Sequence, residues 1–287
     1  MKAILLDYWE LTKPGVTFMV LISTFGGFYL GASESIQVVL LLNTLLGTWL
    51  VAAGTNAFNQ LIESQLDTRM KRTHKRPLPA GRLQPKPVQL FAAVISVAGL
   101  MILALAVNLL TAALAALTLC IYIAVYTPMK RKTSLSTILG AVPGALPAMG
   151  GWAAVRGEVS VEAWVLFAIL FFWQMPHFLA IAWLYREDYA RGGFLVLPVL
   201  DKGGFHTGLY VISNCLALLT VSLLPTLMGM TGGVYFVGAL IMGIGFLISG
   251  FRLTLKTSNR YAKQLLHASI IYLPILIALM ALDKSRF

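Results

Sequence analysis

The sequence has few charged residues and no long polar segment. Only 11% of its 287 residues are charged, and just 11 of them are Asp or Glu. The longest polar stretch runs from about residue 63 to residue 87, which is too short for a soluble domain. Hydrophobic residues make up 58% of the chain, well above the share in ordinary soluble proteins. These features exclude a water-soluble globular protein and predict that lipid solvates the chain.

Nine apolar runs are each about long enough to cross a hydrocarbon core of roughly 30 Å as a helix. They lack the alternation of membrane β-barrel strands, and helices are the other structure that satisfies every backbone amide inside lipid. The runs lie near residues 14–32, 37–60, 87–107, 109–127, 134–154, 162–185, 206–226, 233–252 and 263–283. We therefore expect an all-α fold, a polytopic membrane protein with about nine transmembrane helices in one bundle, and a single domain over residues 1–287.

The basic residues predict the orientation of the chain. All but three of the 22 Lys and Arg residues lie on one side of the predicted spans, and the exceptions are Arg156, Lys284 and Arg286. Since cytoplasmic loops collect Lys and Arg, we expect a cytoplasmic N-terminus, a C-terminus on the opposite side, and a multi-pass protein of the inner cell membrane. The same charges explain the net charge of +11 without a nucleic-acid partner.

The two cysteines do not indicate a functional site. Cys120 and Cys215 both fall inside predicted spans, so neither a disulfide framework nor a thiolate metal site is expected. We interpret both as core residues.

A polar stripe ends the second predicted span. Asn56, Asn59 or Gln60, Glu63 and Asp67 recur every three or four residues, so a helix presents them on one face. Carboxylates and amides at the cytoplasmic end of a bundle are suitable ligands for Mg²⁺ together with substrate phosphate oxygens. The alternative is a helix that has left the membrane and become amphipathic.

A basic loop with prolines follows the stripe and contains Arg72 and Arg76. Basic groups beside carboxylates suit a polyanion bridged by metal, and a diphosphate meets both requirements. A second basic group, Lys130-Arg131-Lys132, follows the fourth span. Membrane topology alone is an alternative explanation for both groups. The cytoplasmic side is where we expect the active site.

The sixth span ends with Trp173, Gln174, His177 and Phe178, and Asp188 follows. An uninterrupted helix would place Gln174, His177 and Asp188 on one face, although Pro176 is a potential kink. The aromatic neighbours favour a pocket for a large flat ligand, with His177 near or on a metal centre. A hydrogen-bonded interior histidine is the alternative.

These motifs resemble those of a known family over nearly the whole chain. The run from Trp173 through Tyr189 to Pro198 is similar to the signature of the haem O synthases, or protohaem IX farnesyltransferases, which are intramembrane prenyltransferases related to ubiquinone-precursor enzymes. Asn59, Glu63 and Asp67, followed by Arg72-Thr73 and Arg76-Pro77, resemble the diphosphate motif of that superfamily. Glu63 stands where Asp is usual, and Leu184 replaces the first acid of the second motif of the quinone branch.

The resemblance implies transfer of a farnesyl group from farnesyl diphosphate to a vinyl group of haem B, with addition of water, to give haem O and diphosphate. It implies Mg²⁺ as cofactor, with haem B a substrate. It implies metal binding by Asn59, Glu63, Asp67 and Asp188, and these four residues and Lys130 are the implied catalytic residues. It implies diphosphate binding by Arg72, Arg76, Lys130 and Arg131. The implied haem-binding residues are Trp173, Gln174 and His177.

Two other functions remain open from the sequence. A quinone-precursor prenyltransferase would use an aromatic acid as acceptor. A transporter would place its polar site near the bilayer midplane at broken helices, whereas the acids here lie at the cytoplasmic ends of spans. If haem O is the product, a haem A synthase or a terminal oxidase is a possible partner.

Overall fold

The computed structural model describes residues 2–32 and 35–285, and helices dominate this part of the chain. Nine helical segments described there are long and apolar enough to cross a membrane, and one of them, Leu109–Met129, consists of three consecutive helical elements. This confirms the expected all-α fold of a multi-pass membrane protein. The helices are α1 (Lys2–Leu11), α2 (Pro14–Gly31), α3 (Val38–Asp67), α4 (Pro85–Ala106), α5 (Leu109–Cys120), the π-helical turn η1 (Ile121–Tyr126), α6 (Thr127–Met129), α7 (Ser136–Arg156), α8 (Val161–Leu184), α9 (Arg186–Arg191), α10 (Leu197–Leu200), α11 (Phe205–Leu227), α12 (Gly233–Leu255) and α13 (Asn259–Leu282).

The largest difference from the predicted spans is at the end of α3. That helix continues to Asp67, well beyond the predicted end at residue 60. The last two turns present Glu63 and Asp67 on a buried face, whereas Gln65 on the other face is exposed. The extension carries the whole polar stripe.

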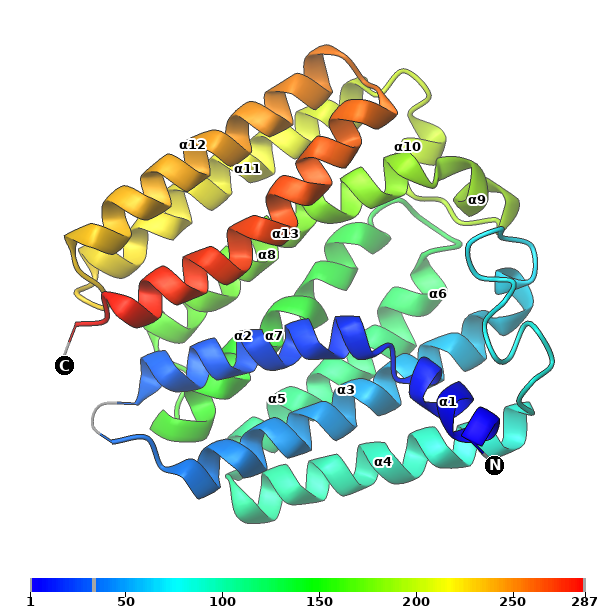
Figure 1. The fold of residues 1–287 in the computed structure, drawn as a ribbon, viewed down its shortest axis with the longest axis horizontal. Coiled ribbons are helices and arrows are strands. Elements are labelled where there is room, and N and C mark those ends of the chain that lie inside the picture. Colours follow the sequence, from blue (N-terminus) through cyan, green and yellow to red (C-terminus); the bar gives the residue numbers. More distant parts are fainter. Residues whose placement is uncertain (1, 33–34, 286–287) are drawn as a thin grey trace.

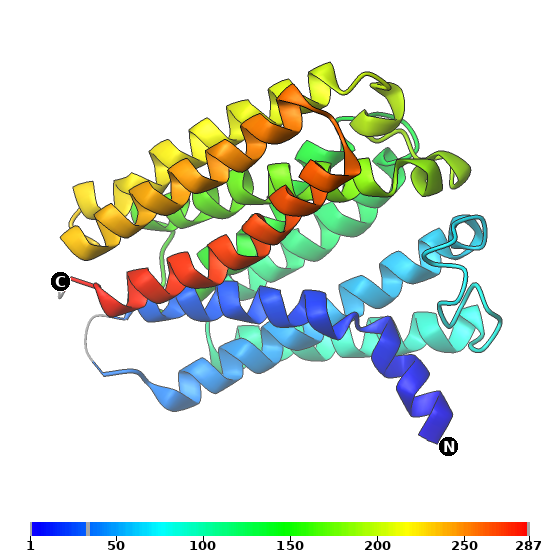
Figure 2. The ribbon, with the colours of Figure 1, turned by 45° about the horizontal axis from the view of Figure 1, so that its top comes forward.

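The connecting segments divide between the two ends of the bundle. The short helices α1, α9 and α10 and the connection between α3 and α4 gather at one end, and the C-terminus lies at the opposite end (Figures 1 and 2). Near that opposite end Lys284 donates hydrogen bonds from Nζ to the carbonyl oxygens of Tyr29, in the last turn of α2, and of Ala32, which follows it. Arg156 ends α7, while Arg286 lies outside the described residues. Arg156 and Lys284 thus lie at the end of the bundle opposite the basic connection between α3 and α4, as the charge pattern predicted (Figure 1).

Helices α2 and α7 cross at glycines. A Cβ atom added to Gly27 would lie 1.9 Å from the carbonyl oxygen of Ala148, and one added to Gly151 would lie 2.0 Å from that of Thr24. Only glycine permits two helix backbones to approach this closely, as small residues do at membrane helix interfaces. The crossing fixes α2 against α7, and both helices line the cavity described below.

Cys215 is buried as expected, but Cys120 is exposed on α5, so the prediction of a core position for Cys120 was wrong. Its span is apolar on every side, and an apolar pattern of that kind does not separate a lipid-facing position from a core position.

Candidate active site

The polar stripe of α3 is buried along its length. Asn56, Asn59, Gln60, Glu63 and Asp67 are each at most 6% exposed, which excludes the alternative of a solvated amphipathic helix end. The stripe divides into two sets by its contacts. Asn56 donates to the carbonyl oxygen of Thr12 and to the hydroxyl of Thr17, and Gln60 donates to the carbonyl oxygens of Glu10 and Leu11. Asn56 and Gln60 therefore hold the junction between α1 and α2.

The other three residues of the stripe face cations from three separate segments. Lys13 Nζ donates to Asn59 Oδ1 at 2.7 Å, and Lys130 Nζ donates to Glu63 Oε1 at 2.8 Å. The third contact joins Arg76 Nη1 and Asp67 Oδ2 at 2.7 Å. We call these six residues the acid–cation cluster: Asn59, Glu63, Asp67, Lys13, Arg76 and Lys130. It brings together five of the sequence-predicted metal and diphosphate residues and adds Lys13 to them; the five are Asn59, Glu63, Asp67, Arg76 and Lys130.

Lys13 is the member of this cluster that the sequence indicated only as one of the basic residues that set the membrane orientation. Its backbone has a positive φ of 47°, a rare conformation outside glycine, and it immediately precedes Pro14 at the start of α2. Burial and, next, the charge of Arg76 lower the pKa of Lys13 to about 7. A lysine directly before a span-initiating Pro-Gly was the only sequence signal that could have singled it out.

The Lys130 ammonium group lies among one carboxylate and two aromatic rings. It is 4.3 Å from the ring centroid of Tyr126 and 5.8 Å from that of Phe194, in addition to its contact with Glu63. Burial acts to lower the pKa of Lys130, but the Glu63 carboxylate more than offsets it, so the pKa is raised well above its usual value. Lys130 is therefore a fixed positive charge, held in place also by the backbone bond from Leu195 N to its carbonyl oxygen.

The donor set of the cluster fits a hard divalent cation. Asp67 Oδ1 is buried and has no hydrogen-bond partner among the described residues, although Oδ2 contacts Arg76. An unpaired buried carboxylate oxygen is costly unless something binds it. Nowhere in residues 2–32 and 35–285 do three or more His, Cys, Asp or Glu side chains converge as a complete metal centre. Two carboxylates and one amide suit Mg²⁺, which usually keeps waters and takes phosphate oxygens as further ligands.

Asp188 does not share a helix with Gln174 and His177. Helix α8 ends at Leu184 and Asp188 belongs to the separate helix α9, so the uninterrupted helix that would place the three residues on one face is not formed. Its two carboxylate oxygens accept the backbone N–H groups of Lys71 and Arg72, each at 3.1 Å. Arg191 also contacts it. Burial opposes ionisation of Asp188, but these N–H groups and Arg191 lower its pKa.

Two predicted diphosphate residues are outside the acid–cation cluster. The Arg72 guanidinium lies 4.8 Å from the ring centroid of Tyr185 and donates to the Tyr189 hydroxyl at 3.3 Å. Arg131 is exposed on the connection after α6. Both are at the same end of the bundle as the cluster but do not contact its acids in the described structure.

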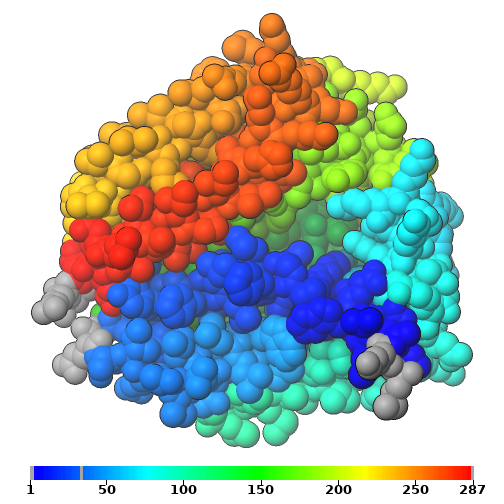
Figure 3. Space-filling model, viewed as in Figure 1, coloured from blue at the N-terminus to red at the C-terminus, as the bar shows by residue number. Residues whose placement is uncertain are grey.

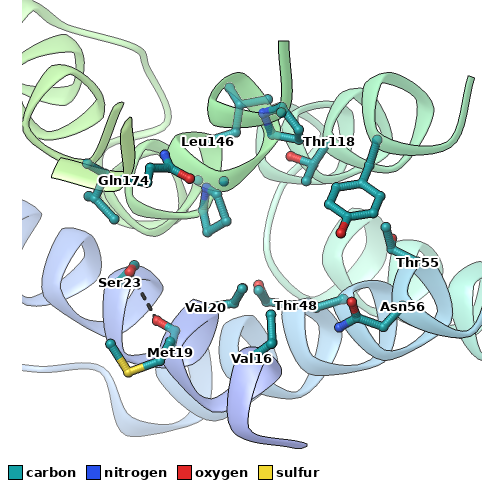
Figure 4. A pocket seen from close by; sticks show the side chains of 18 of the residues that line it. Val16, Met19, Val20, Ser23, Thr48, Thr55, Asn56, Thr118, Leu146 and Gln174 are labelled. Carbon is teal, nitrogen blue, oxygen red and sulfur yellow. Dashed lines mark hydrogen bonds between the residues drawn. The ribbon is translucent and has the colours of Figure 1, made fainter. Parts of the chain in front are cut away.

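An apolar cavity of about 550 Å³ extends into the membrane region beside the cluster. Residues of α2 and α3, including Val16 and Asn56, face Leu146 of α7 and Gln174 of α8 across it (Figure 4). Figure 3 shows a hollow in the molecular surface between α2 and α13, and both helices contribute lining residues. Its volume is in the range of about 300–1,000 Å³ found for small-molecule sites.

The π-helical turn η1 joins the cavity to the cluster. It interrupts the regular helix between α5 and α6, and both of its tyrosines, Tyr122 and Tyr126, line the cavity. Their rings pack edge to face with centroids 4.9 Å apart. Because Tyr126 also lies against Lys130, one ring touches both the apolar chamber and the charged site. Such π-helical turns are frequent at functional sites, and the apolar run over residues 109–127 predicted only a regular helix here.

The three residues predicted to bind a flat ligand all line this cavity. Trp173 and His177 stack with ring centroids 5.2 Å apart and an angle of 23° between their planes. Gln174 donates from Nε2 to the carbonyl oxygen of Ala141 at 2.9 Å. A Cβ atom on Gly144 would lie 2.0 Å from Gln174 Oε1, so glycine at that position makes room for the carboxamide.

Residues 20–273 match the UbiA prenyltransferase family. The chain is 46% identical over 287 residues to a protoheme IX farnesyltransferase of Solibacter usitatus (strain Ellin6076), with 97% of this chain and 98% of that protein covered. It is 42% identical over 277 residues to a protoheme IX farnesyltransferase of Salinibacter ruber (strain DSM 13855 / M31), with 96% and 98% covered.

The fold is similar to solved structures. A structure of a digeranylgeranylglyceryl phosphate synthase matches with a TM-score of 0.79 at 18% identity, covering 97% of this chain and 98% of that one. A UbiA homolog from Archaeoglobus fulgidus, bound to GPP and Mg²⁺, matches with a TM-score of 0.68 at 16% identity, covering 96% and 99%.

Proposed function

The chain belongs to the UbiA prenyltransferase family, and we propose that it transfers a farnesyl group from farnesyl diphosphate to a vinyl group of haem B, giving haem O and diphosphate. The observation that carries this proposal is the contact through Tyr126 between the acid–cation cluster and an apolar cavity lined by Trp173, Gln174 and His177. The acid–cation cluster suits a metal-bound diphosphate, and the apolar cavity suits a prenyl chain and a flat aromatic acceptor. The name shared by the relatives supports the choice of haem B.

In this proposal Asn59, Glu63 and Asp67 hold Mg²⁺, which when bound would neutralise charge on the diphosphate oxygens. Each member of that set lies against a cation. In a metal–diphosphate complex, the metal would bind the acids, and the anionic diphosphate oxygens would pair with Lys13, Arg76 and Lys130. The fold of the A. fulgidus homolog, which was solved with GPP and Mg²⁺, is compatible with such a site.

The predicted roles of Asp188, Arg72 and Arg131 differ in their support. The Asp188 oxygens accept loop amides, which favours a role in holding the segment that carries Arg72 and Arg76; direct metal binding by Asp188 stays a prediction. Arg72 and Arg131 are exposed at the same end of the bundle, where they raise the local positive potential that attracts a diphosphate.

Lys130, Arg76 and Lys13 stabilise the diphosphate as the bond from its oxygen to C1 of the farnesyl group breaks. Charge stabilisation of this kind, directed at the developing anion, is a large contribution to catalysis. The allylic cation forms beside the rings of Tyr122 and Tyr126, and aromatic faces attract cations. The apolar cavity keeps bulk water from the cation before the acceptor reacts.

The haem vinyl group supplies the electron pair for the new carbon–carbon bond. The cation left on the former vinyl group takes up one water, which loses a proton and leaves a hydroxyethylfarnesyl arm. Trp173, Gln174 and His177 would position the haem within the same cavity.

We propose further that the whole chain acts as one prenyltransferase domain in the inner cell membrane, with its N-terminus and active site on the cytoplasmic side. The lipid bilayer is its solvent, and no nucleic acid takes part. A haem A synthase or a terminal oxidase that consumes haem O is the proposed protein partner.

The test is product formation by membranes that contain the protein. We expect haem B, farnesyl diphosphate and Mg²⁺ to yield farnesylated haem detectable by mass spectrometry, and we expect the Asp67→Asn variant to abolish it. If verified folded protein gives no haem product but farnesylates an aromatic acid, the quinone-precursor alternative replaces this proposal.

A further inference from the structure

Ser269 of α13 makes three hydrogen bonds at the wall of the cavity, and it is completely buried. Its Oγ donates to the carbonyl oxygen of Leu266 at 2.6 Å, and the same Oγ lies 2.7 Å from His177 Nδ1. Its backbone carbonyl oxygen accepts from Trp173 Nε1 at 2.8 Å. One residue on α13 therefore fixes two aromatic side chains of α8.

These contacts determine which nitrogen of His177 carries the proton. A hydroxyl has one hydrogen, and a backbone carbonyl can only accept, so the Ser269 hydrogen points to Leu266. Ser269 Oγ must then accept from His177, which places the imidazole hydrogen on Nδ1. In the neutral ring the other nitrogen, Nε2, has a free lone pair.

His177 Nε2 has no hydrogen-bond partner among the described residues, and His177 lines the cavity. The ring is held by the stack on Trp173 and by an edge-to-face contact with Phe178 at 5.8 Å between centroids. Proteins prepare histidine as a metal ligand in this manner, with one nitrogen bonded to a fixed acceptor and the other aimed at the metal.

Few other side chains at the cavity could bind iron. The remaining described histidines, His74, His206 and His267, do not line it, and neither do the cysteines. Met19 of α2 does line it and carries a thioether, and Tyr122 and Tyr126 carry phenols. Of these groups, only the imidazole is a neutral nitrogen ligand already oriented by a hydrogen bond.

We propose that His177 binds the iron of the haem substrate through Nε2, and that Ser269 is a positioning residue that fixes the tautomer and orientation of His177. This inference rests on the proposed function, because it takes haem B as the occupant of the cavity. The sequence indicated only that His177 lies near or on a metal centre, and the inference adds the ligand atom and a second residue.

The test is the absorption and electron paramagnetic resonance spectra of ferric haem B bound to the purified protein in lipid nanodiscs. We expect the unsubstituted protein to give an imidazole-ligated haem, the His177→Ala variant to lose that signature, and added imidazole to restore it. His267→Ala is the matched control, because His267 is an exposed histidine of α13 that does not line the cavity, and it should keep the unsubstituted spectrum.

For Ser269→Ala we expect haem affinity to fall about 10- to 100-fold, as for loss of other residues that orient a metal-binding histidine. Ser269→Thr, which keeps the hydroxyl, should recover the affinity and the spectrum. Size-exclusion chromatography of each variant establishes that it is folded before its spectrum is compared.

Iron ligation by His177, the positioning role of Ser269 and the proposed function can each be refuted separately. An unchanged spectrum in folded His177→Ala would refute iron ligation, and unchanged haem affinity in folded Ser269→Ala would refute the positioning role. If the unsubstituted protein makes haem O without an imidazole-ligated haem, only this inference fails. If it neither binds haem nor makes haem O, the proposed function fails as well.

Discussion

Glu63 and Lys130 form the most enclosed ion pair of the site, with side chains 7% and 13% exposed. Removing one partner of a buried pair leaves the other charge uncompensated. A buried ion pair by itself contributes little to folding stability. The position of this pair beside the cavity indicates a role in the reaction. In the proposed mechanism Glu63 binds metal and Lys130 stabilises the departing diphosphate.

The Glu63→Gln substitution tests this role. It keeps the size of the side chain and removes its charge, so we expect kcat/KM for farnesyl diphosphate to fall by about 10²–10³-fold, the usual effect of losing one preorganised electrostatic group. Steady-state assays at saturating haem measure it. Glu158→Gln, the same change at an exposed position on the other end of the bundle, should leave kcat/KM as it was. Equal values for both variants would remove Glu63 from the mechanism.

The sequence could predict Asn59, Glu63, Asp67 and Lys130 because these residues form short motifs, either at helical spacing or in a basic run. It could not predict Lys13 or Ser269 as site residues. Lys13 meets Asn59 across 46 positions of sequence, and Ser269 meets His177 across 92. A single lysine before a span and a single serine inside one have many ordinary explanations, and only the packing of the helices reveals their partners.

At the scale of elements, α9 holds the basic connection that follows α3. Asp188 accepts the amides of Lys71 and Arg72, and α9 exists as a separate helix because α8 ends at Leu184. The sequence did not show this break, because the residues around it contain no glycine and the one proline, Pro176, is accommodated inside α8. Beyond the break, Asp188 contacts the connection that follows α3 and does not line the cavity.

Asp188→Asn should loosen this connection. Hydrogen bonds to a charged group contribute about 1.5–3 kcal/mol each, so we expect cleavage by trypsin after Lys71 or Arg72 to accelerate about tenfold or more. The rate of fragment appearance in detergent micelles measures it. The adjacent exposed residue supplies a control, since Glu187→Gln removes the same charge without touching the loop amides. An unaltered cleavage rate in Asp188→Asn would show that the carboxylate does not hold the loop.

The crossing of α2 and α7 gives a second prediction for elements. Gly151→Ala forces a methyl group against the carbonyl oxygen of Thr24, and overpacking of this kind costs about 1–3 kcal/mol or more. We expect a lower midpoint of thermal unfolding in detergent. Gly150→Ala, one residue away in the same helix with no atom within 4 Å of the added Cβ, should change the midpoint little. Similar midpoints for the two variants would contradict the close crossing.

At the scale of the whole molecule, the number of spans and their order follow from hydropathy alone, because every apolar run of sufficient length became a helix. The cavity does not follow from hydropathy. Lipid-facing and cavity-facing positions are both apolar, as Cys120 of α5 illustrates, and only the packing of the helices separates them. The cavity is formed by residues of α2, α3, α5, η1, α7, α8 and α13.

The orientation of the molecule can be tested with single cysteines. Lys75→Cys and Glu158→Cys place thiols at exposed positions on opposite ends, in a chain whose Cys120 and Cys215 are replaced by alanine. In intact cells we expect a membrane-impermeant maleimide to label the Glu158→Cys variant and to reach Lys75→Cys only after permeabilisation. The reverse pattern would invert the proposed topology.

The most direct measurement offers both acceptors to the protein at once. Vesicles containing the protein receive farnesyl diphosphate, Mg²⁺, haem B and an aromatic acid of the kind used in quinone synthesis, and mass spectrometry identifies which acceptor gains the farnesyl group. We predict farnesylated, hydrated haem and an unmodified aromatic acid. A farnesylated aromatic acid beside unchanged haem B would contradict haem B as the substrate.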